Sequence, residues 1–392
     1  MFEKSILVIN TGSSSLKFGL YEERNGEERL LLDGLADGIG RSAGKIELKN
    51  ADRRVLRSEN LSFKSEGDAL DHAARWLTEL SPSKPSAIGH RVVHGGPRLL
   101  THQPITPAIL EELRACVHFA PIHIPVALQL IERTEKSYPG VQQFACFDTA
   151  FHKNLPEAAS RFPLPRPLFD EGIRRYGFHG LSYESVVYQL GRGLASRTIM
   201  AHLGNGASLA AVNEGKSVDT SMGLTPTGGI PMATRTGDID PGVLLYLLRA
   251  KQMNVDSLEK LLNKSSGLTA LSDGTADMRG LEAAAEKGDQ PAQLAIEIFC
   301  TSIRKVIAAY TAVLGGLDML VFAGGIGEHS IRVRRDVCHQ LGFLGIVIDD
   351  AINRSNGGEI SSANSRVRVR IVPSQEDFQI ARHCRTLMRL NE

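Results

Sequence analysis

Near its start the sequence reads Ser5-Ile6-Leu7-Val8-Ile9, then Asn10-Thr11-Gly12-Ser13-Ser14-Ser15, then Leu16-Lys17-Phe18-Gly19-Leu20-Tyr21. A short apolar run, a turn of small polar residues and a second apolar run predict a strand, a tight turn and another strand. The same pattern recurs at 198–212, where the turn reads Leu203-Gly204-Asn205-Gly206-Ala207-Ser208. We therefore expect two similar halves, each of which begins its sheet with a hairpin.

Helices and buried strands alternate along the rest of the chain. The clearest predicted helix spans 289–314, with Pro291 near its start, an apolar stripe along its length and Gly315-Gly316 after its end. An apolar run at 141–147 predicts a buried strand. The last predicted helix, at about 375–390, has an apolar face and a basic face and should pack onto a folded body.

Three other stretches carry weaker signals. Residues 24–66 contain many charges and glycines, a composition that fits antiparallel strands with one solvated face. The Pro-rich or polar stretches 80–85 and 162–170 are predicted loops, too short to be free linkers. Because strands alternate with helices in both halves, the sequence predicts an α/β fold.

Length, charge and cysteine content exclude several classes of protein. The chain has 392 residues, and at about 150 residues per domain this length suggests two or three domains. Lys+Arg 45 against Asp+Glu 44 leaves a net charge of +1, so we expect binding to neither nucleic acid nor an anionic membrane. The five cysteines are odd in number and never spaced Cys-x-x-Cys, which argues against a disulfide framework. We recognise no secretory leader and no membrane span, and we expect a cytoplasmic protein.

Glycine-rich turns between strands can offer backbone N–H groups to phosphate. Gly215-Lys216-Ser217 resembles the end of a P-loop, but Ala210 stands where that motif requires glycine. Gly204-x-Gly206 lacks the third glycine of a dinucleotide-binding fingerprint. Both motifs are rejected, yet the two hairpin turns and Phe322-Ala323-Gly324-Gly325-Ile326-Gly327-Glu328 together give three turns that suit phosphate or nucleotide.

Longer motifs resemble those of the acetate kinase family, within the superfamily of acetate and sugar kinases, chaperone ATPases and actin. The segments that carry the resemblance are Val8 to Lys17, Gly89-His90-Arg91-Val92-Val93-His94-Gly95-Gly96, Phe147-Asp148-Thr149-Ala150-Phe151-His152, Tyr176-Gly177-Phe178-His179-Gly180, His202 to Gly206, Thr234-Arg235-Thr236-Gly237-Asp238-Ile239-Asp240-Pro241 and Gly325 to Glu328. They follow one another in the family's order over nearly the whole chain. Residues 226–233 differ from the family's usual sequence in this segment. The segment Pro373-Ser374-Gln375-Glu376-Asp377 is a variant of the family motif Pro-Thr-Asn-Glu-Glu.

The resemblance implies an actin-like fold of two similar domains, each a mixed sheet flanked by helices, with the active-site cleft between them. The implied N-terminal domain contains residues 1–149 and about 380–392, and the implied nucleotide-binding domain contains residues 150–379. The implied reaction is reversible transfer of the γ-phosphoryl group of ATP to acetate, giving acetyl phosphate and ADP. It requires Mg²⁺, with Mn²⁺ as an alternative, and the implied assembly is a homodimer.

The resemblance also implies which residues form the site. Catalysis is assigned to Arg91, Asp148, His179 and Arg235, and Mg²⁺ to Asn10 and Glu376. The acetate pocket is assigned to Arg91, Val93, Ile122, Phe178 and Pro226. ATP and ADP are assigned to Ser13, Ser15, Lys17, His202, Leu203, Gly204, Asn205, Gly206, Asp277, Met278, Arg279, Gly325, Ile326, Gly327, Glu328 and His329.

The chemistry of phosphoryl transfer gives these residue types their roles. Positive charge must be held at the equatorial oxygens of the phosphoryl group, a task for the planar forked donors of Arg91 and Arg235. His179 would donate to the same oxygens. A carboxylic acid acceptor is already an anion at neutral pH and needs no base, so we expect Asp148 to orient an arginine. An alcohol acceptor would instead require Asp148 as a base, which is how the family's active-site convention treats this position.

Two alternatives stay open at the level of sequence. The first is a propionate or butyrate kinase, because Ile122 replaces the family's usual leucine and the unusual 227–233 loop lies beside Pro226. The second is an actin-like or chaperone-type ATPase with the same scaffold and no acceptor. We favour acetate because Val93 would fill the space that a longer acceptor needs.

Overall fold

The computed structural model describes residues 5–12, 15–80 and 84–390. Contacts between Cα atoms divide the chain into two compact units. The first contains the described residues up to Ala150 and those from Gln375 onward, and the second contains Phe151–Ser374. That these units correspond to the two predicted domains stays a prediction.

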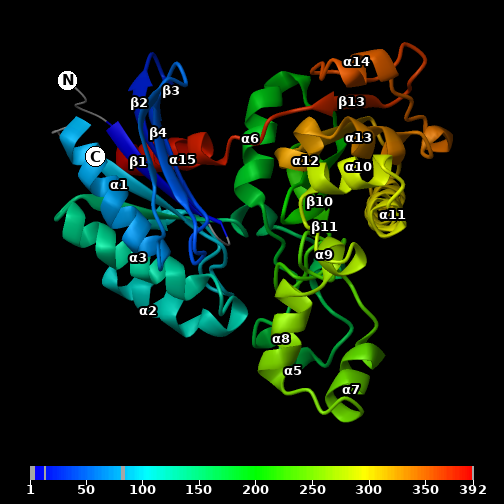
Figure 1. The fold of residues 1–392 in the computed structure, drawn as a ribbon, viewed down its shortest axis with the longest axis horizontal. Coiled ribbons are helices and arrows are strands. Elements are labelled where there is room, and N and C mark those ends of the chain that lie inside the picture. The colour runs from blue at the N-terminus through cyan, green and yellow to red at the C-terminus, as the bar shows by residue number, and fades with distance from the viewer. Residues whose placement is uncertain (1–4, 13–14, 81–83, 391–392) are drawn as a thin grey trace. The chain divides into compact units, whose positions relative to one another are not determined.

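The first unit is built on a mixed sheet in the order β5-β4-β3-β2-β1-β6-β8-β7. Figure 1 labels strands β1 to β4 of this sheet. Its strands are β1 (Ser5–Thr11), β2 (Ser15–Arg24), β3 (Glu27–Asp37), β4 (Lys45–Asn50), β5 (Val55–Asn60), β6 (Ala87–Val92), β7 (Gln103–Pro104) and β8 (Gln142–Phe147). Strands β1 to β5 form an antiparallel meander, whereas β6 runs parallel to both β1 and β8. The predicted hairpin is confirmed, with Asn10 opposite Lys17.

Helices α1 (Glu66–Leu80), α2 (Pro107–Ala115), α3 (Ile124–Ser137) and α15 (Glu376–Leu390) also belong to the first unit. Helices α1 and α3 pack against each other. Their apolar faces form one hydrophobic core with Leu7, Ile9 and Phe18 of the sheet. The single tryptophan of the chain, Trp76 on α1, lies in this core with 4% of its surface exposed. Its fluorescence therefore reports on the first unit alone.

Helix α15 packs onto the sheet of the first unit at β1 and β6, which confirms that the last helix covers a folded body. Gly89 on β6 makes this close approach possible, because a Cβ atom there would lie 2.5 Å from Ile380 Cγ2 and 2.6 Å from Cys384 Sγ. The basic face of α15 is not simply solvated: Arg382 and Arg385 pair with Glu28, at 3.0 and 2.7 Å. The Glu28 side chain is only 2% exposed, so these pairs fix the helix on the β2–β3 hairpin.

The second unit contains the sheet β11-β10-β9-β12-β13. Its strands are β9 (Arg197–Leu203), β10 (Ala207–Asn213), β11 (Lys216–Thr220), β12 (Met319–Ala323) and β13 (Arg368–Ile371). Strands β9 to β11 form an antiparallel meander, and β12 runs parallel to both β9 and β13. The first unit has the same arrangement in β3-β2-β1-β6-β8, which confirms that the two halves begin their sheets alike.

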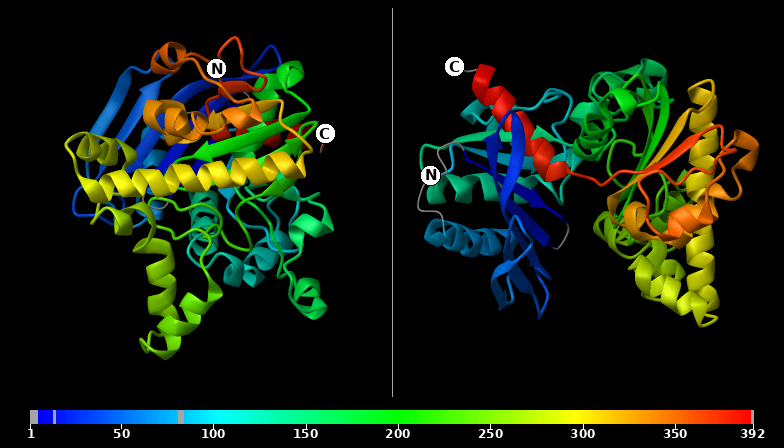
Figure 2. Two further views of the ribbon diagram at one scale, coloured as in Figure 1. Left: turned by 90° about the vertical axis from the view of Figure 1, so that its right-hand side faces the viewer. Right: turned by 90° about the horizontal axis from the view of Figure 1, so that it is seen from above.

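The longest helix, α11 (Gln290–Val313), contacts β9 and β10 of this sheet, and Figure 2 shows its full length. Asp289 caps its start by accepting a hydrogen bond from the backbone N–H of Ala292 at 2.8 Å. The buried residues Ile296, Phe299 and Ile303 follow its apolar stripe. The helix predicted at 289–314 is thus confirmed.

The other helices of the second unit are α4 (Glu157–Ser160), α5 (Arg166–Asp170), α6 (Gly180–Leu190), α7 (Pro241–Arg249), α8 (Val255–Lys264), α9 (Gly267–Leu271), α10 (Met278–Glu286), α12 (Gly324–His329), α13 (Ile331–Cys338) and α14 (Asp350–Arg354). Two predictions were wrong here. The loop expected at 162–170 contains α5, where Pro167 near the helix start already has helical φ. The segment 322–328, expected to be a turn, contains the end of β12 and most of the short helix α12. No helix in the described part of the chain is long and apolar enough to cross a membrane.

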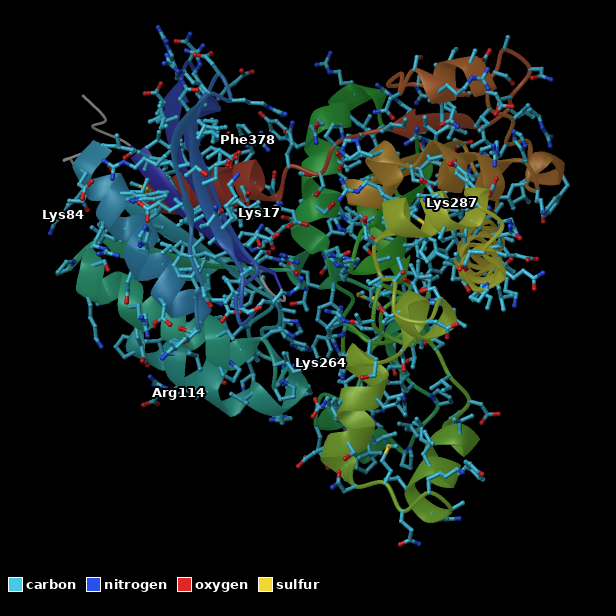
Figure 3. The ribbon with its side chains drawn as sticks, in the orientation of Figure 1. Lys17, Lys84, Arg114, Lys264, Lys287 and Phe378 are labelled. Atoms are coloured by element: carbon cyan, nitrogen blue, oxygen red, sulfur yellow. The ribbon has the colours of Figure 1, made fainter. Side chains whose placement is uncertain are left out.

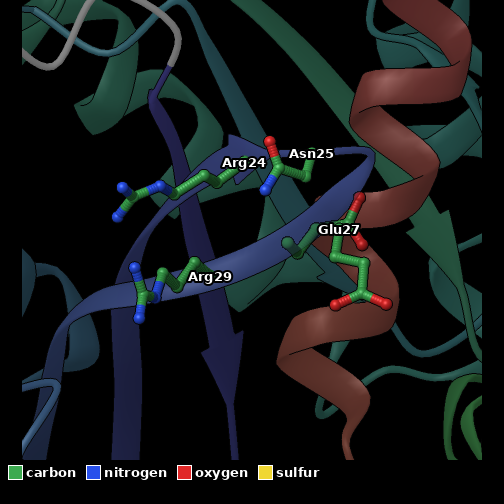
Figure 4. Close-up of a pocket in the computed structure, with 5 residues that line it drawn as sticks. Arg24, Asn25, Glu27 and Arg29 are labelled. Atoms are coloured by element: carbon green, nitrogen blue, oxygen red, sulfur yellow. The ribbon is translucent and has the colours of Figure 1, made fainter.

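A surface hollow in the first unit is lined by Arg24, Asn25, Glu27, Glu28 and Arg29 at the β2–β3 turn (Figure 4). Arg24 is seven residues from Lys17 along β2, which at about 3.3 Å per residue places the two some 23 Å apart. Both signs of charge line the hollow, and its arginines are exposed. We assign no chemistry to it.

Replacing Gly89 with alanine should push α15 away from β6. Overpacking of a closed core costs about 1–3 kcal/mol, and we expect Gly89→Ala to lower the free energy of unfolding of the first unit by that amount. Urea titration followed by Trp76 fluorescence measures it. Ser58→Ala on the exposed strand β5 is the control and should leave the midpoint unchanged; an equal midpoint for Gly89→Ala would show that α15 does not need this close approach.

Candidate active site

Three predicted site residues of the first unit lie at the carboxyl ends of parallel strands. Asn10 is near the end of β1, Arg91 is near the end of β6, and Asp148 follows β8. The register pairs Ile9 with His90 and Arg91 with Cys146, so all three side chains reach the same edge of the sheet. Open α/β sheets place their binding sites at this edge.

Arg91 and Asp148 form a two-pronged ion pair. The Arg91 Nε donates to Asp148 Oδ2 at 3.0 Å, and Arg91 Nη2 donates to the same carboxylate oxygen at 2.6 Å. Asp148 is 1% exposed. Burial alone would lower the pKa of Arg91, but the carboxylates of Asp148 and Glu376 raise that pKa above its usual value. The guanidinium therefore stays charged and has a fixed orientation.

Asn10 connects this pair to the start of α15. Its Oδ1 accepts from Arg91 Nη1 at 3.1 Å, while its Nδ2 donates to Asp377 Oδ1 at 2.7 Å and to Glu376 Oε2 at 3.3 Å. Asn10 and Glu376, the two predicted metal ligands, are thus brought together. One amide oxygen and nearby carboxylates are the hard oxygen donors that Mg²⁺ prefers, so these residues fit that ion.

Asp377 belongs to the same cluster, and the sequence interpretation missed it. Burial raises the pKa of Asp377, while the charge of Lys17 and the hydrogen bond from Asn10 act to lower it. Its only signal in the sequence was its place beside Glu376 in the variant motif at 373–377. Although consecutive helical residues do not usually share a face, both carboxylates accept from the Asn10 amide at the end of β1.

The predicted phosphate contacts of the first hairpin are partly described. Ser13 lies outside the described residues, Ser15 begins β2, and Lys17 is an exposed residue of β2 (Figure 3). Of the predicted acetate pocket, Val93 follows β6 half-buried and Ile122 is 39% exposed. Phe178 and Pro226 belong to the second unit, so the pocket that these four residues are predicted to form together stays a prediction.

In the second unit, His179, His202 and Arg235 gather around Gly206. The His179 and His202 rings stack with centroids 4.3 Å apart. A Cβ atom on Gly206 would lie 3.2 Å from His179 Nε2 and 3.7 Å from Arg235 Nη1. Arg235 Nη1 also donates to the carbonyl of Pro226 at 3.0 Å. The loop after β9, the residue before α6 and the 226–235 segment therefore meet at one place.

The turn after β9 also meets α12. Gly324 has φ +75, and a Cβ atom on it would lie 2.8 Å from the carbonyl oxygen of Leu203, so only glycine fits this contact. A Cβ atom on Gly204 would lie 4.0 Å from the backbone nitrogen of Gly325. The predicted nucleotide segments 202–206 and 325–329 are thus adjacent. Asn205 holds the loop by accepting a backbone hydrogen bond from Ala233 at 3.2 Å.

The Glu328 side chain, predicted to contact nucleotide, makes hydrogen bonds within the protein. Its Oε1 accepts from the backbone N–H groups of Gly324 and Ser374, each at 2.9 Å. The fully buried Arg334 donates to the carbonyls of Gly327 and Glu328, at 2.9 and 2.8 Å. The sequence interpretation missed Arg334, whose guanidinium fixes the end of α12.

The predicted adenosine segment 277–279 lies at the start of α10. Met278 is buried at 3% exposure, which agrees with a packing role, whereas the Arg279 side chain is 89% exposed and pairs with Asp277 at 3.4 Å. Helix α10 is joined to the residue that follows α12 through a hydrogen bond from Ser330 to Glu282. Ile326 and His329 complete α12.

Comparisons with known proteins identify the family. A sequence model described as the acetokinase family matches residues 5–382. This chain belongs to that family. It is 42% identical to an acetate kinase of Rhodopseudomonas palustris, with 96% of this chain and 97% of the relative covered. It is 40% identical to an acetate kinase of Acetivibrio thermocellus, with 98% and 99% covered.

Solved structures of the acetokinase family have the same fold. The acetate kinase of Porphyromonas gingivalis superposes with a TM-score of 0.87 at 36% identity, covering 98% of this chain and 100% of that one. A propionate kinase of Francisella tularensis superposes with a TM-score of 0.91 at 37% identity and the same coverage. The predicted family and the predicted fold of mixed sheets flanked by helices are confirmed.

Family membership makes the protein a kinase, a phosphotransferase that acts on a carboxyl group. It favours this activity over the actin-like or chaperone-type ATPase that the sequence left open. The roles assigned to individual residues stay predictions, and the structure adds which of them lie together. Asn10, Arg91, Asp148 and Glu376 form one cluster, and His179, His202, Gly206 and Arg235 form another.

Two buried histidines close to these clusters should stay uncharged well below neutral pH. Burial lowers the pKa of His90, which is hydrogen-bonded to Gln143, to about 4, and burial lowers the pKa of His152 to about 4 as well. Unfolded histidine titrates near 6.5, so the unfolded chain takes up these protons first. Stability should therefore fall between about pH 6.5 and pH 4, by about 3 kcal/mol for each histidine.

Imidazole ¹⁵N spectra of the folded protein check this expectation, with His90→Gln and His152→Gln to assign the signals. Both rings should be neutral at pH 5.5. A ring that titrates near 6.5 would contradict its burial in the native protein.

Proposed function

We propose that this protein is an acetate kinase, which transfers the γ-phosphoryl group of ATP to acetate and runs the reverse reaction from acetyl phosphate and ADP. The observation that carries the proposal is the Arg91–Asp148 pair in a chain of the acetokinase family. Both oxygens of the Asp148 carboxylate accept from Arg91 Nε. In this geometry Asp148 would orient Arg91. A carboxylate acceptor is already ionised, so it does not need Asp148 as a general base.

The acceptor itself supplies the nucleophile. A carboxylic acid with an ordinary pKa near 4 is ionised at neutral pH, so no proton has to be removed before attack. Asp148 engages Nε and Nη2 of Arg91, and Asn10 engages Nη1, so Arg91 would bind the acceptor carboxylate through the remaining N–H groups of Nη1 and Nη2. The attacking oxygen is then held in place for in-line displacement at the γ-phosphorus.

The donor is proposed to bind the second unit. The loop 202–206 and helix α12 offer backbone N–H groups, with the 277–279 segment on the adenosine side. Arg235 and His179 would donate to the equatorial oxygens as their charge develops in the transition state. Ser15 and Lys17 would contact phosphate from the first unit.

Mg²⁺, or Mn²⁺ in its place, is proposed to be held at Asn10 and Glu376, with Asp377 beside them. When bound, such an ion would supply positive charge that offsets the charge of the terminal phosphate groups. Waters and phosphate oxygens would complete its six ligands, as is usual for magnesium in proteins. Asp377 holds the amide group of Asn10 in place through the 2.7 Å hydrogen bond.

Propionate is the second candidate acceptor, because the solved propionate kinase has a higher TM-score than the solved acetate kinase of Porphyromonas gingivalis. Overall similarity does not decide between acceptors that differ by one methylene, since the pocket around the methyl group does. Val93, Ile122, Phe178 and Pro226 are proposed to form that pocket. We favour acetate because β-branched Val93 occupies space directly after the strand that carries Arg91.

The protein is also proposed to be a cytoplasmic homodimer. Helix α7 has the sequence PGVLLYLLR, yet none of its residues is buried within the chain. Val243, Leu245 and Tyr246 on it are 39%, 48% and 54% exposed. An apolar helix left uncovered in this way is suited to pack against a second copy. The five cysteines are all free thiols, as in a reducing compartment.

Purified protein with ATP, Mg²⁺ and acetate should form an acyl phosphate that hydroxylamine traps as a hydroxamate. One methylene in a small apolar pocket is worth about 1–3 kcal/mol, so kcat/KM for acetate should exceed that for propionate by roughly ten- to two-hundred-fold. Val93→Ala should narrow this ratio, and EDTA should abolish the signal. No hydroxamate at high acetate would refute a kinase acting on acetate, and equal use of propionate would identify the second candidate.

Removing either member of the Arg91–Asp148 pair should have nearly the same consequence. An arginine that acts on phosphoryl charge raises turnover by about 10³–10⁵-fold. We therefore expect Arg91→Ala to lower kcat by about that factor, and Asp148→Asn to cause most of the same decrease in kcat. The double variant should be no worse than Arg91→Ala, because the two residues act as one unit. Losses that multiply in the double variant would give Asp148 a role of its own, such as a general base.

A further inference from the structure

A chain of buried hydroxyl groups leads to one ring nitrogen of His179. Tyr183 Oη lies 2.6 Å from Ser208 Oγ, and Ser208 Oγ lies 2.8 Å from His179 Nδ1. Tyr183 is on α6 and Ser208 is on β10, next to the turn at 203–206. Both are 0% exposed, so water does not compete for these hydrogen bonds.

The direction of each hydrogen bond follows from which groups hold a proton. Burial raises the pKa of Tyr183, so its phenol keeps its proton, and the backbone N–H of His202 donates to the same oxygen. The phenol proton is therefore available for Ser208 Oγ, which accepts it. Ser208 has a single proton of its own, and it is left to donate that proton to His179 Nδ1.

An imidazole nitrogen that accepts a hydrogen bond carries no proton, so in a neutral ring the proton is on the other nitrogen. The His179 and His202 rings stack with centroids 4.3 Å apart, and because two imidazolium groups at this distance would repel each other, the two rings are not both charged. Nε2 lies on the side of Gly206 and Arg235, where a Cβ atom on Gly206 would be 3.2 Å away. The proton thus points toward the predicted phosphoryl site.

We infer that Ser208 and Tyr183 are positioning residues that hold His179 as the Nε2–H tautomer, so that its proton is directed at the transferring phosphoryl group. His179 has φ 58, a left-handed conformation that is uncommon for a residue with a side chain. Its position just before α6 thus needs support from its surroundings. Ser208 supplies part of that support by fixing the rotation of the ring. The part of the inference that rests on the proposed function is the donation of the Nε2 proton to the phosphoryl group. The tautomer itself can be observed without any substrate.

The tautomer is tested on the protein without substrate. With ¹⁵N-labelled histidine and His179→Gln to assign the signals, the wild-type ring should show a protonated Nε2 and an unprotonated Nδ1 at neutral pH. Ser208→Ala removes the donor to Nδ1 and should shift His179 toward a mixture of tautomers. Ser208→Thr keeps a hydroxyl group and should preserve the wild-type spectrum. A wild-type ring protonated at Nδ1, or a spectrum that Ser208→Ala leaves unchanged, would overturn the inference.

Kinetics test what the proton does. A donor that acts only on developing charge affects kcat and leaves KM nearly unchanged. Removal of one such donor lowers kcat by a factor on the order of 10²–10³. Ser208→Ala keeps His179 but no longer holds its proton on Nε2, so we expect this variant to lower kcat by up to about 100-fold. KM for acetate and for ATP should change little. Tyr183→Phe keeps the ring and should give a smaller loss of kcat in the same direction.

Ser217→Ala is the matched control. Ser217 Oγ makes a 2.7 Å hydrogen bond with His152 Nδ1 in the same unit, and both residues are buried. Its loss should lower stability as Ser208→Ala does, while kcat stays near the wild-type value. Equal losses of kcat in the two variants would assign Ser208 to folding and overturn the inference. A wild-type enzyme that forms no acyl phosphate, but has the expected tautomer, would count against the proposed function and support the placement of the proton.

Discussion

The candidate chemistry depends on one constraint, namely that parallel strands end at the same edge of a sheet. In the first unit, β1, β6 and β8 are parallel, and Asn10, Arg91 and Asp148 meet where they end. In the second unit, β9 and β12 are parallel with His202 opposite Ala323, which brings the 202–206 turn beside Gly324. Because each unit begins with an antiparallel hairpin, the hairpin turn falls at this edge too. Two copies of one arrangement therefore produce two clusters of polar residues.

The two clusters have opposite electrostatic character. The first contains the carboxyl groups of Asp148, Glu376 and Asp377 beside the cations Arg91 and Lys17, and it is the cluster at which we propose that a metal cation binds. The second contains Arg235, the imidazole rings of His179 and His202, and backbone N–H groups that can donate to an anion. A similar scaffold thus carries unlike residues at its strand ends, while the strand order stays the same.

Local signals made much of the fold predictable from the sequence. The hairpins were found from their apolar runs and polar turns, and α11 from its apolar stripe, Pro291 near its start and Gly315-Gly316 after its end, because these signals lie within or beside the elements themselves. The family motifs gave most of the candidate site residues. Helix α5 was missed because its prolines suggested a loop, although proline suits the first turn of a helix.

What the sequence could not reveal depends on contacts between distant segments. Ser208 lies in an ordinary strand and Tyr183 in an ordinary helix, and nothing in either pattern indicates that both hydroxyl groups lead to His179. The pairing of Arg382 with Glu28 joins residues 354 positions apart. Such partners become visible only when the strands and helices are packed together.

The return of the chain to its first unit has a consequence for synthesis on the ribosome. Strands β1 to β8 leave the ribosome before the second unit, whereas helix α15, which covers Gly89 and pairs with Glu28, leaves after it. The second unit is one continuous stretch, Phe151–Ser374, and can complete its fold as a unit during translation. Until α15 is synthesised, the face of the first sheet that it covers at β1 and β6 lacks that cover, and apolar surface exposed in this way is prone to aggregate.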